Sequence, residues 1–261
     1  MLSIGGWSLS AAFPILSRDP SARANFAQQS ADFVIQQGFD GIDIDWEYPG
    51  LVRDPDKVDN PNDQGHPNGK PDDGKFYIEL LKDVREKLDE AGRRTGKYYE
   101  LSIAAPAGMN KSEWLNGSLV AGNGGTMHWI RDIGQVVDFI NIMSYDLHGT
   151  WDSFTGHHSG IYADSERTEA ISNRDDDNDF GINKDVLSDE DIKAFAEQYA
   201  REEDTKYYTV EDAAAAYARA GVPKNKLVVG SPFYSRGWYV DLTKDYEVIQ
   251  GLPGLYAPVR M

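Results

Sequence analysis

Three carboxylic acids alternate along one short segment of the chain. Asp43, Asp45 and Glu47 stand at positions i, i+2 and i+4, and apolar residues fill the positions between them. In a β-strand the three carboxyl groups would point to one side, about 6.6 Å apart along the strand, with the apolar side chains on the other side. Crowded carboxylates separate their pKa values, so that one retains a proton while another stays ionised. This spacing therefore favours general acid catalysis over a solvent-facing acidic strand.

The rest of the chain must supply the elements that position these acids. Five short apolar segments, separated by helix-like or loop-rich sequence, have the pattern of buried parallel strands. They are Leu2–Trp7, Phe39–Asp45, Tyr98–Ala104, Val136–Ser144 and Leu227–Phe233. Strands alternating with helices imply a parallel sheet with right-handed crossovers, in either an open doubly wound sheet or a (β/α) barrel. In a barrel the three acids would point inward at the C-terminal mouth, where barrel active sites lie.

Helical patterns and caps lie between the predicted strands. Ala22–Gln37 has an apolar face that includes Phe33, and Gly38 is its predicted C-terminal cap. A second helix is predicted around 76–88, where apolar residues recur every four positions. A third begins after Thr209, a predicted N-cap with Asp212 as its third-position partner, and ends at a glycine.

Two long polar segments interrupt this alternation, near residues 53–74 and 159–206. The first is rich in Asp, Asn, Pro and Gly, which predicts a surface loop. The second is very acidic, and its run Asp175–Asp179 invites comparison with a calcium-binding loop. The glycine at position 181 does not match the spacing of such a loop. A solvated acidic loop is therefore the simpler interpretation.

The composition excludes several classes of site. With 43 acidic and 26 basic residues the net charge is −17, which argues against nucleic acid and against an anionic membrane surface as partners. The absence of cysteine excludes disulfides, thiolate metal sites and thiol nucleophiles. No apolar run approaches the ~20 residues of a membrane span. No export signal is recognised either; if the protein is exported, its signal lies upstream of this sequence or is not of the usual kind.

Four motifs resemble those of the family 18 chitinases, the bacterial chitinase A type in particular. DGIDIDWEYP at 40–49 resembles the family's acidic signature, and SIGGW at 3–7 its third-strand motif. MSYDLHG at 143–149 and VGSPFYSRGW at 229–238 resemble its sixth- and seventh-strand motifs. The resemblance implies an α/β fold, a (β/α)8 TIM barrel of which this chain covers about strands three to seven. Residues 1–261 would then form one catalytic barrel segment, with 241–261 as the start of an α+β insertion.

The resemblance also implies a substrate-assisted, retaining mechanism. Glu47 would protonate the glycosidic oxygen, and the N-acetyl carbonyl of the sugar would attack the anomeric carbon to give an oxazolinium ion. Asp45 would orient the acetamido group and stabilise this ion, while Asp43 would share a proton with Asp45. Tyr145 would hold the acetamido carbonyl oxygen. No metal or organic cofactor enters this scheme.

Further residues are expected to contact the sugar chain, with core packing or a structural ion pair as their alternative roles. Met143 would pack beneath the sugar, and Asp146 would bind hydroxyl groups. The others are Trp7 and Trp151 as stacking platforms on the leaving-group side, and Tyr234 and Arg236 as polar contacts. Three histidines, His148, His157 and His158, lack the carboxylate pattern of a metal site and are interpreted as loop residues.

The implied function is hydrolysis of β-1,4 linkages in chitin or chito-oligosaccharides by an extracellular enzyme. Two alternatives are an endo-β-N-acetylglucosaminidase and a non-catalytic chitin-binding subunit of a larger assembly. Glu47 favours an enzyme, because lectins of the family usually lack this glutamate. The missing strands one, two and eight predict that the sequence is a fragment or that other polypeptide completes the barrel, and that the isolated chain hydrolyses chitin poorly.

Overall fold

The computed structural model describes residues 1–57, 60–70, 72–107, 129–150, 155–162 and 209–238. The chain divides into two compact units, which are described separately below. The first contains Met1–Met143 and Ala213–Gly230, and the second contains Ser144–Asp212 and Ser231–Met261.

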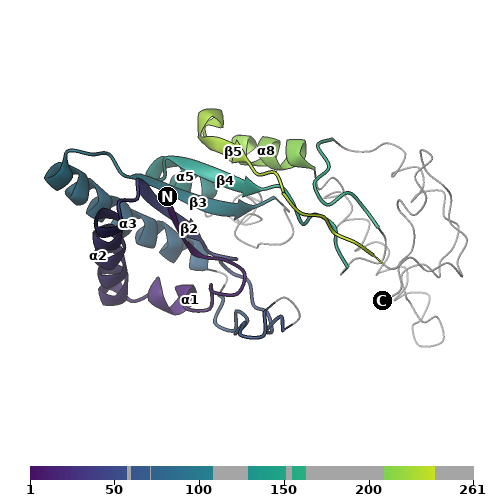
Figure 1. Ribbon diagram of the computed structural model, residues 1–261, viewed down its shortest axis with the longest axis horizontal. Helices are drawn as coiled ribbons and strands as arrows, with labels where there is room; N and C mark the ends of the chain where they lie inside the picture. The colour runs from purple at the N-terminus through teal and green to yellow at the C-terminus, as the bar shows by residue number, and fades with distance from the viewer. Residues whose placement is uncertain (58–59, 71, 108–128, 151–154, 163–208, 239–261) are drawn as a thin grey trace, which may run out of the picture. The chain divides into compact units, whose positions relative to one another are not determined.

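A parallel sheet forms the centre of the first unit, with its five strands in sequence order (Figure 1). The strands are β1 (Leu2–Gly5), β2 (Gly41–Asp45), β3 (Glu100–Pro106), β4 (Phe139–Met143) and β5 (Leu227–Val229). Each overlaps a predicted segment, and all but β3 are shorter than that segment. The register places Ser3 of β1 and Ser102 of β3 on either side of Asp43 in β2.

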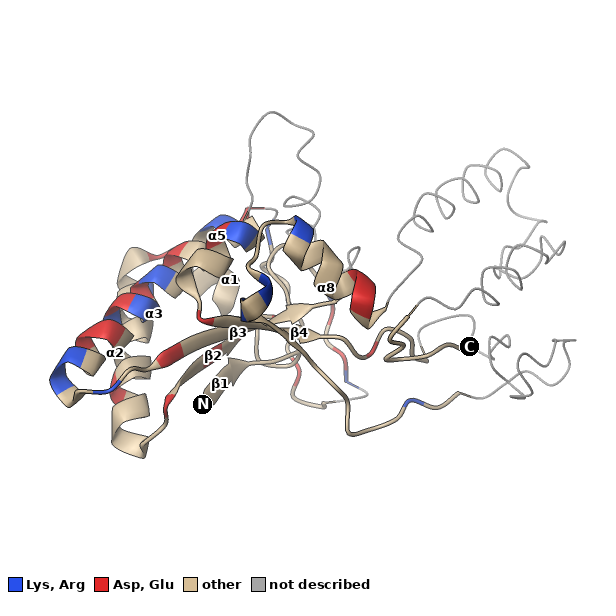
Figure 2. Ribbon diagram, turned by 90° about the horizontal axis from the view of Figure 1, so that it is seen from above, with Lys and Arg blue, Asp and Glu red and all other residues tan. Residues whose placement is uncertain are grey.

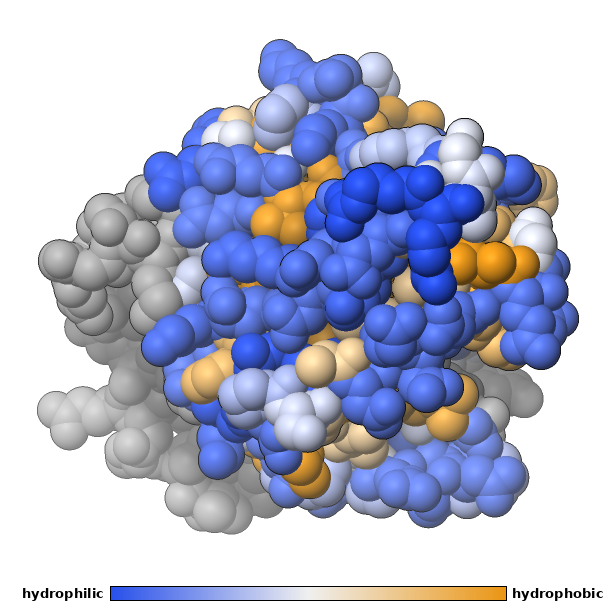
Figure 3. Space-filling view, turned by 90° about the vertical axis from the view of Figure 1, so that its left-hand side faces the viewer, coloured by the Kyte–Doolittle hydropathy of each residue, from blue (hydrophilic) through white to orange (hydrophobic). Residues whose placement is uncertain are grey.

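Helices α2, α3 and α5 lie side by side on one face of this sheet, with α3 between the other two (Figure 2). The helical elements of the chain are α1 (Phe13–Leu16), α2 (Pro20–Gln37), α3 (Asp73–Thr95), α5 (Trp129–Val136), α8 (Val210–Arg219) and the 3-10 turn η1 (Lys224–Lys226). Basic and acidic residues are interspersed along the outer surface of α3 (Figure 2), whereas α2 carries only Arg23 and Asp32 as charged residues. On the face shown in Figure 3, hydrophilic side chains predominate and hydrophobic ones form small separate patches.

The predicted caps of two helices are confirmed. Gly38 ends α2 in the left-handed conformation with φ 74°. The Thr209 hydroxyl accepts a hydrogen bond from the Asp212 backbone N–H at 3.1 Å and bonds the Asp212 carboxylate at 2.7 Å. The second helix is longer than predicted: it runs past Gly92 to Thr95, and Gly96 is its C-terminal cap. A Cβ at Gly92 would lie 2.6 Å from the Lys97 carbonyl oxygen, so this glycine serves close packing rather than termination.

The core lies between the sheet and these helices. Ile42 and Ile44 of β2, together with Leu80 and Leu88 of α3, are completely buried. The prediction that Phe33 belongs to the buried face of α2 is wrong, since 42% of this residue is exposed. Phe33 instead stacks on Phe39 at a ring-centroid distance of 6.4 Å.

The predicted loop at 53–74 is only partly a surface loop. Helix α3 begins within it, at Asp73, and the side chains of Asp63 and His66 are completely buried. Polar residues can be buried there because each finds a partner, as described below. Most of the acidic segment 159–206, including Asp175–Asp179, and the predicted insertion 241–261 lie outside the described residues. No helix in the described part of the chain is long and apolar enough to cross a membrane.

Candidate active site

The predicted alternation of side chains along β2 is confirmed. Ile44 and Trp46 are 0% and 1% exposed, whereas Asp43, Asp45 and Glu47 are all partly exposed. The apolar side chains point toward the helices, where the Trp46 ring stacks on Phe13 at 5.4 Å. The three acids therefore share the face of β2 that the helices leave uncovered.

Asp43 is held by donors from three neighbouring strands. Its carboxylate accepts hydrogen bonds from Ser3 Oγ at 2.8 Å, Ser102 Oγ at 2.5 Å and Asn141 Nδ2 at 3.1 Å. A carboxylate that accepts several hydrogen bonds is fixed in both position and orientation. None of the three donors was predicted, because the two serines are identified only by the register of β1 and β3 against β2, which the structure supplies.

Asp45 has a different environment from Asp43. Burial, together with the nearby charges of Glu47 and Asp43, raises the pKa of Asp45 to about 7. Its Oδ1 atom is buried and has no hydrogen-bond partner among the described residues. A buried polar atom without a partner is costly, so this oxygen suits a donor supplied by a ligand.

Ser10 fixes the backbone that carries Glu47. The Ser10 hydroxyl accepts a hydrogen bond from the Glu47 N–H at 2.9 Å, and it lies 2.8 Å from the Gly6 carbonyl and 3.2 Å from the Asp45 carbonyl. Only 1% of Ser10 is exposed. The peptide bond that follows Glu47 is cis. The sequence analysis missed Ser10, because a serine in a turn carries no signal of a contact with a residue 37 positions away.

Gly5 and Gly6 allow the backbone at the end of β1 to approach Asp45 closely. Gly5 has φ 122°, and a Cβ at this position would lie 2.1 Å from the Asp45 carbonyl oxygen. The Gly6 N–H donates to the same oxygen at 2.7 Å. Any side chain at position 5 would therefore displace the segment that holds Asp45.

Trp7 follows these glycines and is partly exposed. The Arg53 guanidinium lies over its ring at 3.9 Å from the centroid, and the Tyr48 ring meets it in an edge-on arrangement at 6.3 Å. Tyr48 is buried, and this burial, the charge of Glu47 and a hydrogen bond with Glu47 raise the pKa of the Tyr48 hydroxyl. Met143 is the last residue of β4. The predicted roles of Trp7 and Met143 in sugar binding remain predictions.

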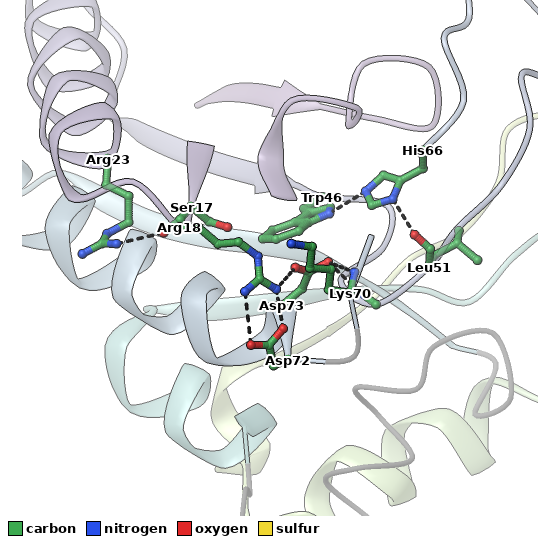
Figure 4. A network of polar contacts seen from close by, with 10 residues as sticks. Ser17, Arg18, Arg23, Trp46, Leu51, His66, Lys70, Asp72 and Asp73 are labelled. Carbon is green, nitrogen blue, oxygen red and sulfur yellow. Dashed lines mark hydrogen bonds and ion pairs between the residues drawn. The ribbon is translucent and has the colours of Figure 1, made fainter. Parts of the chain in front are cut away.

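A polar network lies behind β2 (Figure 4). The Trp46 indole N–H donates to His66 Nε2 at 2.9 Å, and His66 Nδ1 lies 2.5 Å from the Leu51 carbonyl oxygen. Burial lowers the pKa of His66. Asp73 is completely buried and pairs with Arg18 at 2.7 Å. These contacts hold the chain after β2 against the start of α3.

A second polar cluster, in the other unit, surrounds Asp146. Its carboxylate accepts hydrogen bonds from Tyr234 Oη and Arg236 Nε, both at 2.6 Å. Burial raises the pKa of Asp146, but the hydrogen bonds from Arg236 and Tyr234 outweigh this effect, and the net shift is downward. Tyr145 contacts the Tyr234 ring edge-on at 6.2 Å. Tyr234 and Arg236 thus form the structural ion-pair cluster that was one of their two predicted roles, and their contact with sugar stays a prediction.

The remaining predictions concern Trp151 and the three histidines. Trp151 lies outside the described residues. His158 Nδ1 lies 3.9 Å from Asp146 Oδ1. Among the residues that the structure describes, no group of three or more His, Cys, Asp or Glu side chains could hold a metal ion.

Comparison with known proteins identifies the family. The model of "Glycosyl hydrolases family 18" matches residues 1–251. The chain belongs to glycosyl hydrolase family 18. Chitinase 1 of Aphanocladium album is 32% identical over 240 residues, which are 91% of this chain and 41% of that protein.

Solved structures of the same family resemble the chain along nearly its whole length. Chitinase ChiA74 from Bacillus thuringiensis is 29% identical, with a TM-score of 0.67 over 98% of this chain and 31% of the other. A family 18 N-acetylglucosaminidase from Paenibacillus barengoltzii is 27% identical, with a TM-score of 0.65 over 99% of this chain and 56% of the other. The chain thus spans less than two thirds of each of these relatives. The predicted α/β fold of the family 18 barrel type, of which this chain supplies a part, is confirmed.

Proposed function

We propose that this family 18 chain carries the catalytic acids of a chitinase, which hydrolyses β-1,4 linkages between N-acetylglucosamine units with retention of configuration. The observation that carries the proposal is Asp45. Its pKa is raised to about 7 beside two other acids, and one of its oxygens is buried without a partner. Such a group can exist with or without a proton near neutral pH, and it offers an acceptor to a substrate N–H.

In the proposed first step, Glu47 donates its proton to the glycosidic oxygen as that bond breaks. The carbonyl oxygen of the substrate's own N-acetyl group attacks the anomeric carbon from the opposite side, so the protein supplies no covalent nucleophile. Asp45 accepts a hydrogen bond from the acetamido N–H and stabilises the positive charge of the resulting oxazolinium ion. Water, deprotonated by Glu47, then opens the ring, and the two inversions restore the original configuration.

Asp43 assists this step through its charge, which acts on Asp45. Because three donors hold its carboxylate in place, it provides a fixed negative charge next to Asp45. This charge favours a proton on Asp45 in the free protein, and we propose that the two aspartates share it. When the oxazolinium ion forms, its positive charge offsets the repulsion and favours ionised Asp45.

The remaining sugar contacts in the proposal are those that the family motifs imply. Tyr145 would hold the acetamido carbonyl oxygen, and Asp146 would bind sugar hydroxyls. The other proposed contacts are those of Met143, Trp7, Trp151, Tyr234 and Arg236. The substrate is chitin or its oligomers, encountered outside the cell, and other polypeptide would complete the barrel around it.

Replacing Glu47 with Gln tests the proposal. This change keeps the shape of the side chain but removes its proton, so turnover of chito-oligosaccharides should fall by about 10²–10⁴-fold. Calorimetry should show that binding of the same oligomers is retained. Unchanged turnover would contradict the assignment of Glu47 as the acid.

The named activity of the P. barengoltzii relative keeps a second candidate open, an N-acetylglucosaminidase. Product analysis separates the two. Internal cleavage of chitin hexamers supports a chitinase, whereas release of single N-acetylglucosamine units, or of glycans from a high-mannose glycoprotein, supports the alternatives. Proton NMR of the first products should show the β-anomer if configuration is retained.

A further inference from the structure

The segment after the catalytic strand folds back on itself through one antiparallel bridge. Arg53 N donates to His66 O at 3.3 Å, and His66 N donates to Arg53 O at 2.9 Å. The two side chains of this bridge extend to different tryptophans. Arg53 covers Trp7, which follows β1, and His66 bonds Trp46, which lies between Asp45 and Glu47 in the sequence. The bridge therefore links a candidate sugar-binding ring to the strand that carries the acids.

Arg53 is held in place by a buried carboxylate. Its Nη1 and Nη2 atoms donate to the two oxygens of Asp63 at 2.6 and 3.1 Å, in a two-pronged pair. The exposed fractions of the two side chains are 10% and 0%. Asp63 also accepts from the backbone N–H groups of Asp56 at 2.6 Å and Gly65 at 3.1 Å. Such an arrangement leaves the guanidinium little freedom to rotate.

The same guanidinium fixes Trp7 by two contacts. It donates to the Trp7 carbonyl oxygen, and its carbon lies 3.9 Å from the centroid of the indole ring. A cation over an aromatic face is attractive, and the attraction grows when the cation is withdrawn from water. Since Arg53 covers one face of the ring, and Tyr48 approaches it edge-on, the ring is restrained while part of its surface stays open.

We propose that Arg53 and Asp63 are positioning residues that hold the Trp7 ring as a preformed stacking surface for an N-acetylglucosamine unit on the leaving-group side. This inference rests on the proposed function. An aromatic ring that is already oriented loses less conformational freedom when a sugar stacks on it, so binding is tighter. Arg53 and Asp63 themselves need not touch the sugar.

His66 anchors the other strand of the bridge. Because the Trp46 N–H donates to Nε2, the Nδ1 atom of His66 carries the proton and donates to the Leu51 carbonyl. The ring is therefore neutral, in agreement with its lowered pKa. A segment fixed at both Trp46 and Trp7 can hold the stacking ring at a constant distance from the acids.

The test uses a paired variant, Arg53→Met with Asp63→Asn, which removes both charges and leaves no unpaired buried ion. The control pair is Arg23→Met with Asp83→Asn, which removes a similar ion pair of 2.9 Å between α2 and α3. Thermal melting establishes that both variants are folded. If the paired variant does not fold, Arg53→Lys replaces it, because lysine keeps the charge but lacks the planar fork.

The first measurement needs no sugar. The indole N–H resonance of Trp7, assigned by comparison with Trp7→Phe, should shift or broaden in the paired variant and stay in place in the control pair. An unchanged Trp7 resonance, or an equal change in both variants, would overturn the inference.

The second measurement is calorimetric binding of N-acetylglucosamine tetramers to hexamers, with Glu47→Gln present in every variant. The paired variant should bind about fivefold more weakly than the control pair, consistent with a cation–aromatic contact of modest strength. With Trp7→Ala also present, this difference should disappear, because the ring that Arg53 positions is gone. Equal binding by both variants would overturn this inference alone, whereas no binding by any variant would overturn the proposed function with it.

Discussion

Asp45 and Asp63 belong to the same unit, yet their surroundings shift their pKa values in opposite directions. Hydrogen bonds from Arg53 lower the pKa of Asp63 strongly, against the effect of burial. Asp45 has no such partner among the described residues, so burial and the charges of Glu47 and Asp43 raise its pKa to about 7. The hydrogen-bond partners of each carboxyl group and their charges, rather than burial alone, thus distinguish the two acids. Asp63 stabilises the fold, whereas Asp45 is available to a substrate.

The largest expected effect on stability comes from removing one partner of the ion pair between Arg53 and Asp63. Asp63→Asn should lower the free energy of unfolding by about 3–5 kcal/mol at pH 7, because it leaves the buried Arg53 charge uncompensated. The variant that also carries Arg53→Met should lose less than Asp63→Asn alone. Denaturant unfolding measures both, and a paired variant less stable than the single one would contradict this account.

The pH dependence of this loss has a defined sign. The folded-state pKa of Asp63 lies below its unfolded value, so its contribution is fully present above the unfolded pKa, about 3.9. The contribution disappears as the pH falls through the folded pKa. The difference between Asp63→Asn and the unmodified chain should therefore shrink below about pH 4.

Asp45→Asn tests the other half of the comparison, namely that Asp45 contributes to activity rather than to stability. Turnover should fall by about 10²–10³-fold, because the developing positive charge loses its stabilising partner. Stability should not fall with it. The folded pKa of Asp45, about 7, lies above its unfolded value of about 3.9, so this group costs stability as the pH rises between these values. Thermal melting at pH 5 and pH 8 should show a smaller pH dependence in the variant, and an equal loss of activity and stability would contradict the contrast with Asp63.

Ser10→Ala tests the support beneath Glu47. The change leaves the Glu47 N–H without its side-chain acceptor, so stability should fall by about 1–3 kcal/mol and turnover should fall with it. Ser17→Ala is the matched control, because the Ser17 hydroxyl is equally buried and has no hydrogen-bond partner in the described part of the chain. Similar losses in both variants would show that burial of a serine, rather than the contact with Glu47, matters.

The smallest effect is expected at Asp43. Ser3→Ala removes one of three donors at an exposed position and should cost about 0.5–1 kcal/mol and less than about threefold in turnover. Ser102→Ala removes the shorter bond at a completely buried position and should cost more. A larger loss in Ser3→Ala than in Ser102→Ala would indicate that the exposed hydrogen bond to Asp43 contributes more than the buried one.

Features that depend on neighbouring residues could be predicted from the sequence, whereas contacts between distant residues could not. Local patterns predicted the alternation along β2 and the Gly38 cap, because both depend on neighbours a few positions away. Ser10 and Ser102 escaped because their partners are 37 and 59 residues distant, and a serine carries no sign of its partner. The segment 53–74 was misjudged for a related reason. Its polar composition predicts exposure, whereas Asp63 is buried through a bond to Arg53 that composition cannot reveal.

Gly5 sets a limit on how this site can change. Its positive φ and the 2.1 Å distance from a hypothetical Cβ to the Asp45 carbonyl leave room for hydrogen alone. At Gly6 the nearest atom to a Cβ would be Asp45 Oδ2, at 3.8 Å, so a methyl group meets only the strain of φ 92°. In a library randomised at both positions, sequencing of active clones should recover a single residue at position 5 and several small ones at position 6. Two adjacent glycines that look alike in the sequence would thus differ in their tolerance to evolution.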